Sequence, residues 1–209
     1  MKPDSKTVGV GVRGGKVAPG GEQRTSKAVV LIGFMGAGKT SVGRALGERL
    51  GWPFEDLDER IERRERRTVP EIFRDSGEAE FRRAEHEALS ELLGELQAGS
   101  EQVVALGGGA FVQKQNVHLL QVARVFTVFL DADVEELWRR CSRQAEQLGV
   151  ARPLLGNLGS FRKLCEARRR HYRKASFTQK TGGRTVKKIA AEIAHALGLS
   201  PSGKRGKKQ

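Results

Sequence analysis

The segment Gly33–Thr40 (GFMGAGKT) constrains this chain more than any other part of its sequence. It has the form G-x-x-x-x-G-K-[ST], in which backbone N–H groups surround phosphates, the lysine reaches the outer phosphates and the hydroxyl reaches Mg²⁺. The apolar run 28–33 predicts a buried strand before the loop, and the helical spacing of 39–50 predicts a helix after it. We therefore expect a bound nucleoside triphosphate with Mg²⁺. The expected nucleotide contacts are Gly36, Ala37, Gly38, Lys39, Thr40 and Ser41.

Apolar runs alternate with helical patterns along the rest of the chain. Further strands are expected at 53–58, 102–106, 124–130 and 175–179, and helices at 61–73, 78–96, 114–122, 134–148, 161–174 and 185–197. Residues 149–159 are expected to be irregular. Such alternation implies βαβ units and a parallel sheet covered on both faces, hence one α/β domain over residues 28–200.

Charge and composition narrow the class of protein. The net charge is +13, of which residues 1–27 and 201–209 each carry +4, so we interpret these ends as basic tails without structure. We expect at most nonspecific nucleic-acid contact by the tails. No apolar run reaches the roughly 20 residues of a bilayer span, and no secretory signal is recognisable. We expect a cytoplasmic protein without a membrane partner; Cys141 and Cys165 lack metal-ligand spacing.

Acidic residues that could complete a magnesium site follow two of the expected strands. Asp131 ends the run 128–131 and could serve as a Walker B acid, or simply cap the next helix. Asp56 and Asp58 come soon after the P-loop helix, where adjacent strands could place them beside Thr40. We favour Thr40 and Asp56 as the metal-binding residues.

The chain resembles the shikimate kinase family through five further motifs in order. They are 56–58 (DLD), Gly77-Glu78-x-x-Phe81-Arg82, 107–110 (GGGA), 152–155 (RPLL) and Leu164-x-x-x-Arg168-x-x-x-Tyr172. The resemblance implies a three-layer αβα sandwich of the P-loop NTPase type, with a five-stranded parallel sheet in the order 2-3-1-4-5.

The resemblance also implies the chemistry of each motif. Arg82 and Arg168 would hold the substrate carboxylate, for which planar guanidinium groups are suited. The backbone of Gly107, Gly108 and Gly109 would approach the ring. Asp58 would bind substrate hydroxyls and either deprotonate or only orient the attacking one.

A lid over residues 149–159 would bring Arg152 to the phosphates and exclude water, and Arg140 would lie against adenine. Lys39, Asp58 and Arg152 are thus the expected catalytic residues. We expect ATP and shikimate as substrates and a monomer as the working form. Two alternatives stay open, which are another small-metabolite kinase, for example one similar to gluconate kinases, and a non-catalytic nucleotide-binding regulator.

Overall fold

The computed structural model describes residues 28–97, 101–148 and 156–201. Its five strands form one parallel sheet in the order β2-β3-β1-β4-β5, which confirms the expected topology. The strands are β1 (Ala28–Ile32), β2 (Phe54–Asp56), β3 (Gln102–Ala105), β4 (Phe126–Asp131) and β5 (Phe177–Lys180). The expected tails, residues 1–27 and 201–209, lie outside the described ranges apart from Pro201.

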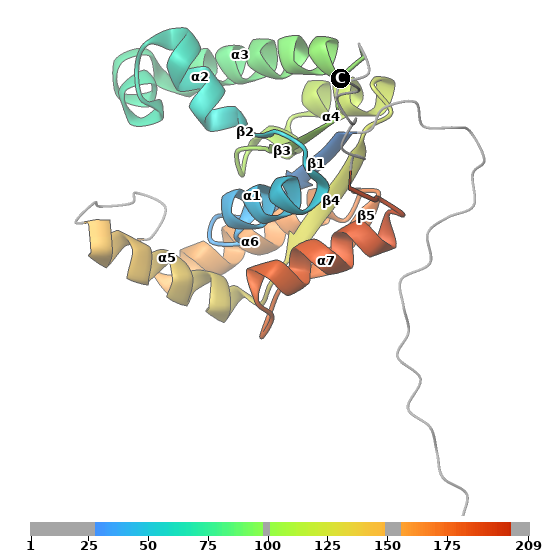
Figure 1. Cartoon of the computed structure of the whole chain (residues 1–209). Helices are drawn as coiled ribbons and strands as arrows, with labels where there is room; N and C mark the ends of the chain where they lie inside the picture. The colour runs from blue at the N-terminus through green and yellow to red at the C-terminus, as the bar shows by residue number, and fades with distance from the viewer. Residues whose placement is uncertain (1–27, 98–100, 149–155, 202–209) are drawn as a thin grey trace, which may run out of the picture.

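Helices connect the strands and cover the sheet (Figure 1). They are α1 (Lys39–Leu50), α2 (Leu57–Glu65), α3 (Val69–Gln97), the short η1 (Ala110–Val112), α4 (Lys114–Val122), α5 (Val134–Leu148), α6 (Leu158–Tyr172) and α7 (Val186–Ala196). α1 and α7 pack side by side in front of the sheet in this view, and α6 lies behind α1. No helix in the described ranges combines the length and apolarity needed to cross a bilayer.

The core follows from the apolar strands. All five residues of β1 are buried, and the last five of β4 are buried as well, as expected of central strands with helices on both faces. Their side chains join those of α1, α3 and α7 in one hydrophobic cluster. The P-loop thus starts from the best buried strand of the sheet.

The region between β2 and β3 differs from the sequence expectation. One helix was expected over 61–73, but α2 ends at Glu65 and a separate helix starts at Val69. Arg66 has φ 52°, and Thr68 and Glu71 form a reciprocal capping box, with the Thr68 N–H donating to the Glu71 carboxylate over 2.7 Å. The expected break at Gly77 is confirmed, because Gly77 has the non-helical angles φ 80° and ψ 177° and divides α3 into two helical parts.

The start of α2 is also displaced. Asp58 was expected at the end of the second strand, but it lies in the first turn of α2, because the Asp56 carboxylate caps that helix by accepting from the Asp58 N–H at 3.1 Å. Likewise α6 begins at Leu158 inside the segment expected to be irregular, since Asn157 accepts from the Ser160 N–H at 2.8 Å.

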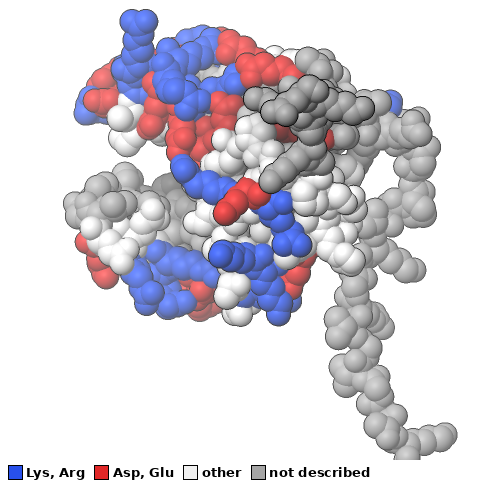
Figure 2. Space-filling view, in the orientation of Figure 1, with Lys and Arg blue, Asp and Glu red and all other residues white. Residues whose placement is uncertain are grey.

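The surface over α2 and α3 carries basic and acidic side chains in mixture (Figure 2). Arg60 pairs with Glu55 and Glu95, and Arg64 pairs with Glu91. The exposed pairs each contribute little stability, whereas Arg60 and Glu55 are both largely shielded from solvent.

We expect two glycine substitutions to have opposite effects on stability. A Cβ on Gly47 of α1 would lie 2.7 Å from the Trp52 carbonyl oxygen, whereas a Cβ on Gly94 of α3 would meet nothing within 4 Å. Gly47→Ala should therefore lower the free energy of unfolding by about 1–3 kcal/mol, because the contact is with backbone. The matched Gly94→Ala should raise it by about 0.5–1 kcal/mol. Urea denaturation measures both, and a shift in the same direction would contradict the packing.

Candidate active site

The carboxyl ends of neighbouring strands bring two glycine-rich loops together. β1 pairs with β3 from Ala28↔Gln102 to Leu31↔Ala105, and the pairing continues as the Leu106 N–H donates to the Leu31 carbonyl at 3.0 Å. A Cβ on Gly108 would lie 3.7 Å from the Gly33 carbonyl oxygen. The P-loop and residues 107–109 therefore lie side by side, with room for little more than a methyl group between them, at the edge of the sheet where ligands bind in open α/β folds.

The P-loop packs closely on α5. Gly36 has φ 76°, and a Cβ there would lie 2.8 Å from the Cys141 sulfur. Lys39 Nζ donates to the carbonyls of Gly33 and Phe34 at 3.0 and 3.2 Å, so its side chain folds back over the loop. Burial lowers the pKa of Lys39, while the carboxylates of Asp58 and Asp56 act in the opposite direction. The loop thus concentrates backbone N–H groups and one cation around the position of a phosphate chain.

Oxygen donors suited to Mg²⁺ lie beside the loop. The Thr40 hydroxyl donates to Asp56 Oδ2 at 2.9 Å, which places a hydroxyl and a carboxylate together at the start of α1. No group of three or more metal-ligating side chains occurs within the described ranges. Mg²⁺ commonly takes only one or two protein oxygens, with water and substrate phosphates completing its shell, so this pair fits the ion.

The rival acid is occupied elsewhere. Asp131 lies at the end of β4, where Arg169 and Lys180 approach its two carboxylate oxygens at 2.9 and 2.5 Å. These two cations neutralise the group that the sequence offered as a Walker B acid. Asp56 is therefore the better placed of the two candidates.

Asp58, in the first turn of α2, lies beside the first glycine of the loop 107–109. A Cβ on Gly107 would be 2.6 Å from Asp58 Oδ1 and 3.3 Å from Glu85 Oε1, so only glycine allows both acids to approach the strand end. Burial raises the pKa of Asp58 to about 6, and the nearby Asp56 charge adds to this. A carboxyl with such a pKa can hold or release a proton near neutral pH.

Arg82 reaches the same loop from α3. Its guanidinium would be 2.6 Å from a Cβ on Gly109, and it donates to Glu85 at 2.9 Å and to Glu78 at 3.0 Å. Glu85 is fully buried and Glu78 is exposed. The Arg82 guanidinium is thus held between the buried Glu85 and the exposed Glu78.

Arg168 approaches from α6, on the P-loop side. It donates to the Gly108 carbonyl at 3.4 Å and lies over the Phe34 ring, 5.6 Å from its centroid. Tyr172, one turn later, donates its hydroxyl to the same carbonyl. In the described ranges Arg168 has no ion pair with a carboxylate. Arg82 and Arg168 therefore flank the glycine loop. Arg82 is paired with carboxylates, whereas Arg168 has no carboxylate partner among the described residues.

The remaining expected site residues divide into two groups. Arg140 of α5 donates to the Gly36 carbonyl at 3.3 Å and pairs with Glu136 at 2.8 Å, so it lies against the P-loop. Ser41 lies exposed in the first turn of α1. Arg152 and the rest of 149–155 lie outside the described residues, so the lid expectation stays a prediction.

Sequence reasoning missed Glu85. Glu85 has 0% exposure and accepts a hydrogen bond from Arg82. Its Oε1 would lie 3.3 Å from a Cβ on Gly107. Its position three residues after Arg82 on one helix was a signal, because side chains at that spacing are neighbours. Its burial could not be read from the sequence, since it depends on α2 and the loop after β3 packing beside α3.

These contacts define a class of protein. A P-loop with Lys39 and Thr40 faces an acid and two arginines across one strand end, which is the arrangement of a P-loop kinase with a small anionic acceptor.

Comparisons with known proteins give the family. A family model described as shikimate kinase matches residues 35–198. A shikimate kinase of Cereibacter sphaeroides is 40% identical over 181 residues, which cover 85% of this chain and 86% of the relative. A shikimate kinase of Symbiobacterium thermophilum is 41% identical over 182 residues, which cover 85% of this chain and 99% of the relative. A shikimate kinase from Acinetobacter baumannii, solved in complex with shikimate, superposes with a TM-score of 0.69 at 36% identity, covering 81% and 92%. The chain belongs to the shikimate kinase family.

Glu85 should make stability depend on pH. Burial raises its pKa from 4.5 to about 7, so the folded chain holds this proton more tightly than the unfolded chain. The resulting stability is complete below the unfolded pKa and is lost as the pH rises through the folded one. Glu85→Gln removes the titration, so the free energy of unfolding should fall less between about pH 5 and 8 than in the parent protein.

Denaturation in urea at several pH values measures this slope. Glu80→Gln is the matched control, because Glu80 lies on the same helix and its pKa is lowered by the Arg83 hydrogen bond. Equal slopes for the parent and Glu85→Gln proteins would contradict the assignment.

Proposed function

We propose that this chain transfers the γ-phosphoryl group of ATP to shikimate, giving shikimate 3-phosphate in the pathway to chorismate and the aromatic amino acids. The observation that carries the proposal is the placement of Arg82, Arg168 and Asp58 around the Gly107–Gly109 loop, in contact with the P-loop. Family membership supports it, as does the shikimate complex of the A. baumannii relative.

The acceptor would bind across the glycine loop. Its carboxylate would take donors from Arg82 and Arg168, because guanidinium forks match a carboxylate in geometry and charge. Its ring would lie on the backbone of Gly107–Gly109, and its hydroxyls would face Asp58. This places the attacking hydroxyl on the side of the loop that faces Lys39, whose pKa responds to the Asp58 charge.

The reaction is mainly one of positioning and charge neutralisation. The acceptor oxygen forms a bond to the γ-phosphorus while the bond between that phosphorus and the bridging oxygen breaks, which leaves ADP. Asp58 either accepts the hydroxyl proton or orients the hydroxyl, and its pKa of about 6 permits the first role at neutral pH. Lys39 and the N–H groups of Gly36–Ser41 stabilise the negative charge on the phosphates.

Magnesium belongs to the same proposal. Mg²⁺ would be held at the Thr40 hydroxyl and Asp56, where it would neutralise phosphate charge. Arg140 would contact the nucleotide beside the P-loop. Arg152, which lies outside the described residues, would add charge and help to exclude water.

The alternatives explain fewer observations. A kinase similar to gluconate kinases would not account for membership of the shikimate kinase family. A non-catalytic regulator would not need Lys39, Asp58 and both arginines around one strand end. That the protein is a cytoplasmic monomer, with basic tails outside a catalytic domain of 28–200, stays a prediction.

The direct test is ADP release in a coupled assay with MgATP, with and without shikimate. We expect turnover that depends on shikimate, and Arg82→Ala should weaken shikimate binding about 10- to 100-fold while sparing ATP, as expected for loss of a charged hydrogen-bond pair. Arg83→Ala is the matched control, because Arg83 is exposed and pairs only with Glu80 and Glu87 among the described residues. A folded protein without shikimate-dependent turnover would contradict the proposal.

The metal assignment has its own test. Chelation by EDTA should abolish ADP release, and Asp56→Asn should raise the Mg²⁺ concentration for half-maximal rate about 10-fold, the scale reported for perturbed metal shells. Glu59→Gln is the control, since Glu59 is a nearby acid of α2 that pairs with Arg44 at the surface. An unchanged Mg²⁺ requirement in Asp56→Asn would exclude this residue from the metal site.

A further inference from the structure

Two consecutive arginines of α6 point to different parts of the molecule. Arg168 faces the Gly108 carbonyl and the Phe34 ring, whereas Arg169 reaches the end of β4. Successive residues of a helix lie about 100° apart around its axis, so the two side chains leave the helix toward different neighbours. The orientation of α6 about its axis therefore decides where both guanidinium groups lie.

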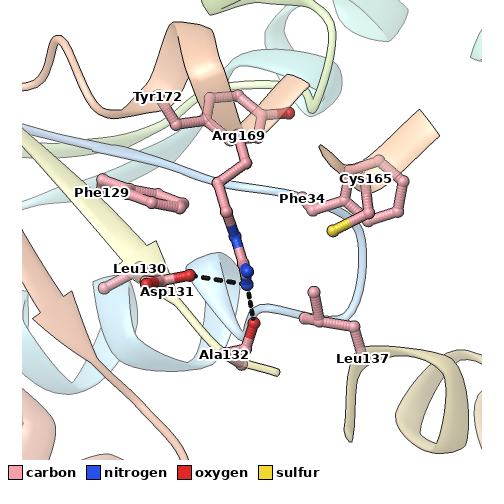
Figure 3. Close-up of a pocket in the computed structure, with 9 residues that line it drawn as sticks. All are labelled: Phe34, Phe129, Leu130, Asp131, Ala132, Leu137, Cys165, Arg169 and Tyr172. Atoms are coloured by element: carbon pink, nitrogen blue, oxygen red, sulfur yellow. Dashed lines mark hydrogen bonds and ion pairs between the residues drawn. The ribbon is translucent and has the colours of Figure 1, made fainter. Parts of the chain in front are cut away.

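Arg169 is held at the end of β4 (Figure 3). Its Nη2 lies 2.9 Å from Asp131 Oδ1 and donates to the Ala132 carbonyl. Asp131 is almost fully buried, and the cavity around the pair is only about 10 Å³. That volume holds a single water at most, so the ion pair is shielded and stronger than a pair at the surface.

Asp131 is fixed in turn by the next strand. Its second oxygen pairs with Lys180 at the end of β5 at 2.5 Å, and its backbone carbonyl accepts from the Thr181 N–H at 2.9 Å. The carboxylate that receives Arg169 therefore belongs to the rigid edge of the sheet. Through it, the last turns of α6 are tied to two strands.

Arg168 lacks such an anchor of its own. Its contacts with the protein are one long hydrogen bond of 3.4 Å to the Gly108 carbonyl, the face of the Phe34 ring and the neighbouring Tyr172 hydroxyl. The long hydrogen bond and the ring face tolerate rotation of a guanidinium group, and no carboxylate in the described ranges holds it. Aromatic contacts of Phe161 and Tyr172 hold α6 against Phe34 and Phe129, but these apolar contacts also allow small rotations.

We propose that Arg169, anchored on Asp131, is a positioning residue that sets the direction of Arg168 toward the acceptor's carboxylate. The inference rests on the proposed function, in which Arg168 binds that carboxylate. Arg169 itself touches neither the glycine loop nor the P-loop backbone in the contacts described. Its removal should therefore act on acceptor binding through the orientation of α6.

Arg169→Ala tests this without leaving a buried charge alone. Lys180 stays on Asp131, so the variant keeps one cation at the carboxylate and should fold. We expect the shikimate KM and Kd to rise about 5- to 20-fold, because a small misplacement of a positioning group is costly. The ATP KM should change less than about twofold, and Arg169→Lys, which restores the charge, should recover most of the loss.

Two variants on the same helix are matched controls. Arg170→Ala removes an exposed neighbour, and Arg162→Ala breaks an exposed pair with Glu135 of α5. Calorimetric titration with shikimate and with MgADP gives the binding constants, and thermal denaturation reports stability. The inference is wrong if Arg169→Ala leaves shikimate binding unchanged, weakens both ligands equally, or behaves like either control.

Arg168→Ala separates this inference from the proposed function. If shikimate binding depends on Arg168 but not on Arg169, only the positioning role fails. If the parent protein neither binds nor phosphorylates shikimate, the proposed function itself fails.

Discussion

The pairing of β1 with β3 on one side and β4 on the other is the interaction on which the rest of the site depends. Because all three strands run in parallel, their carboxyl ends meet at one edge. The P-loop, the Gly107–Gly109 loop and Asp131 follow these strands directly, so backbone hydrogen bonds alone bring them together. The helices then add the charged groups: α1 with Lys39, α3 with Arg82 and α6 with Arg168.

Much of this arrangement could be predicted because its signals are continuous in the sequence. The bounds of α1, α4 and α5 agree with the expectations, since apolar runs and glycine punctuation mark them directly. The strand order agrees with what the resemblance to the shikimate kinase family implies. The choice of Asp56 over Asp131 is supported by geometry for a different reason. Thr40 lies in the first turn of α1 and Asp56 ends β2, and α1 packs against β2, so the two side chains meet when this helix covers the sheet.

The rest depended on contacts that no local pattern reveals. The sequence pattern suits Asp58 at the end of a strand as well as at the start of a helix. Capping by Asp56 decides between the two, because it starts the helix a few residues earlier. The Thr68–Glu71 capping box is a local signal for a helix start, but the helical spacing of residues 61–73 runs across it and indicates one longer helix. Glu85 and Arg169 resemble ordinary surface residues of helices. Their importance comes from burial against β3 and β4, which exists only in the tertiary structure.

Glu78 is exposed and pairs with Arg82, so under the proposed function the acceptor's carboxylate would compete with it for that guanidinium. A ligand carboxylate that bound Arg82 would displace the Glu78 carboxylate, so one anion would replace another. A neutral analogue of the same shape could not replace the Glu78 carboxylate, so it would meet an Arg82 that is still paired. Under the proposed function, the Arg82–Glu78 pair would therefore favour an acceptor that carries a carboxylate over a neutral ring of the same shape.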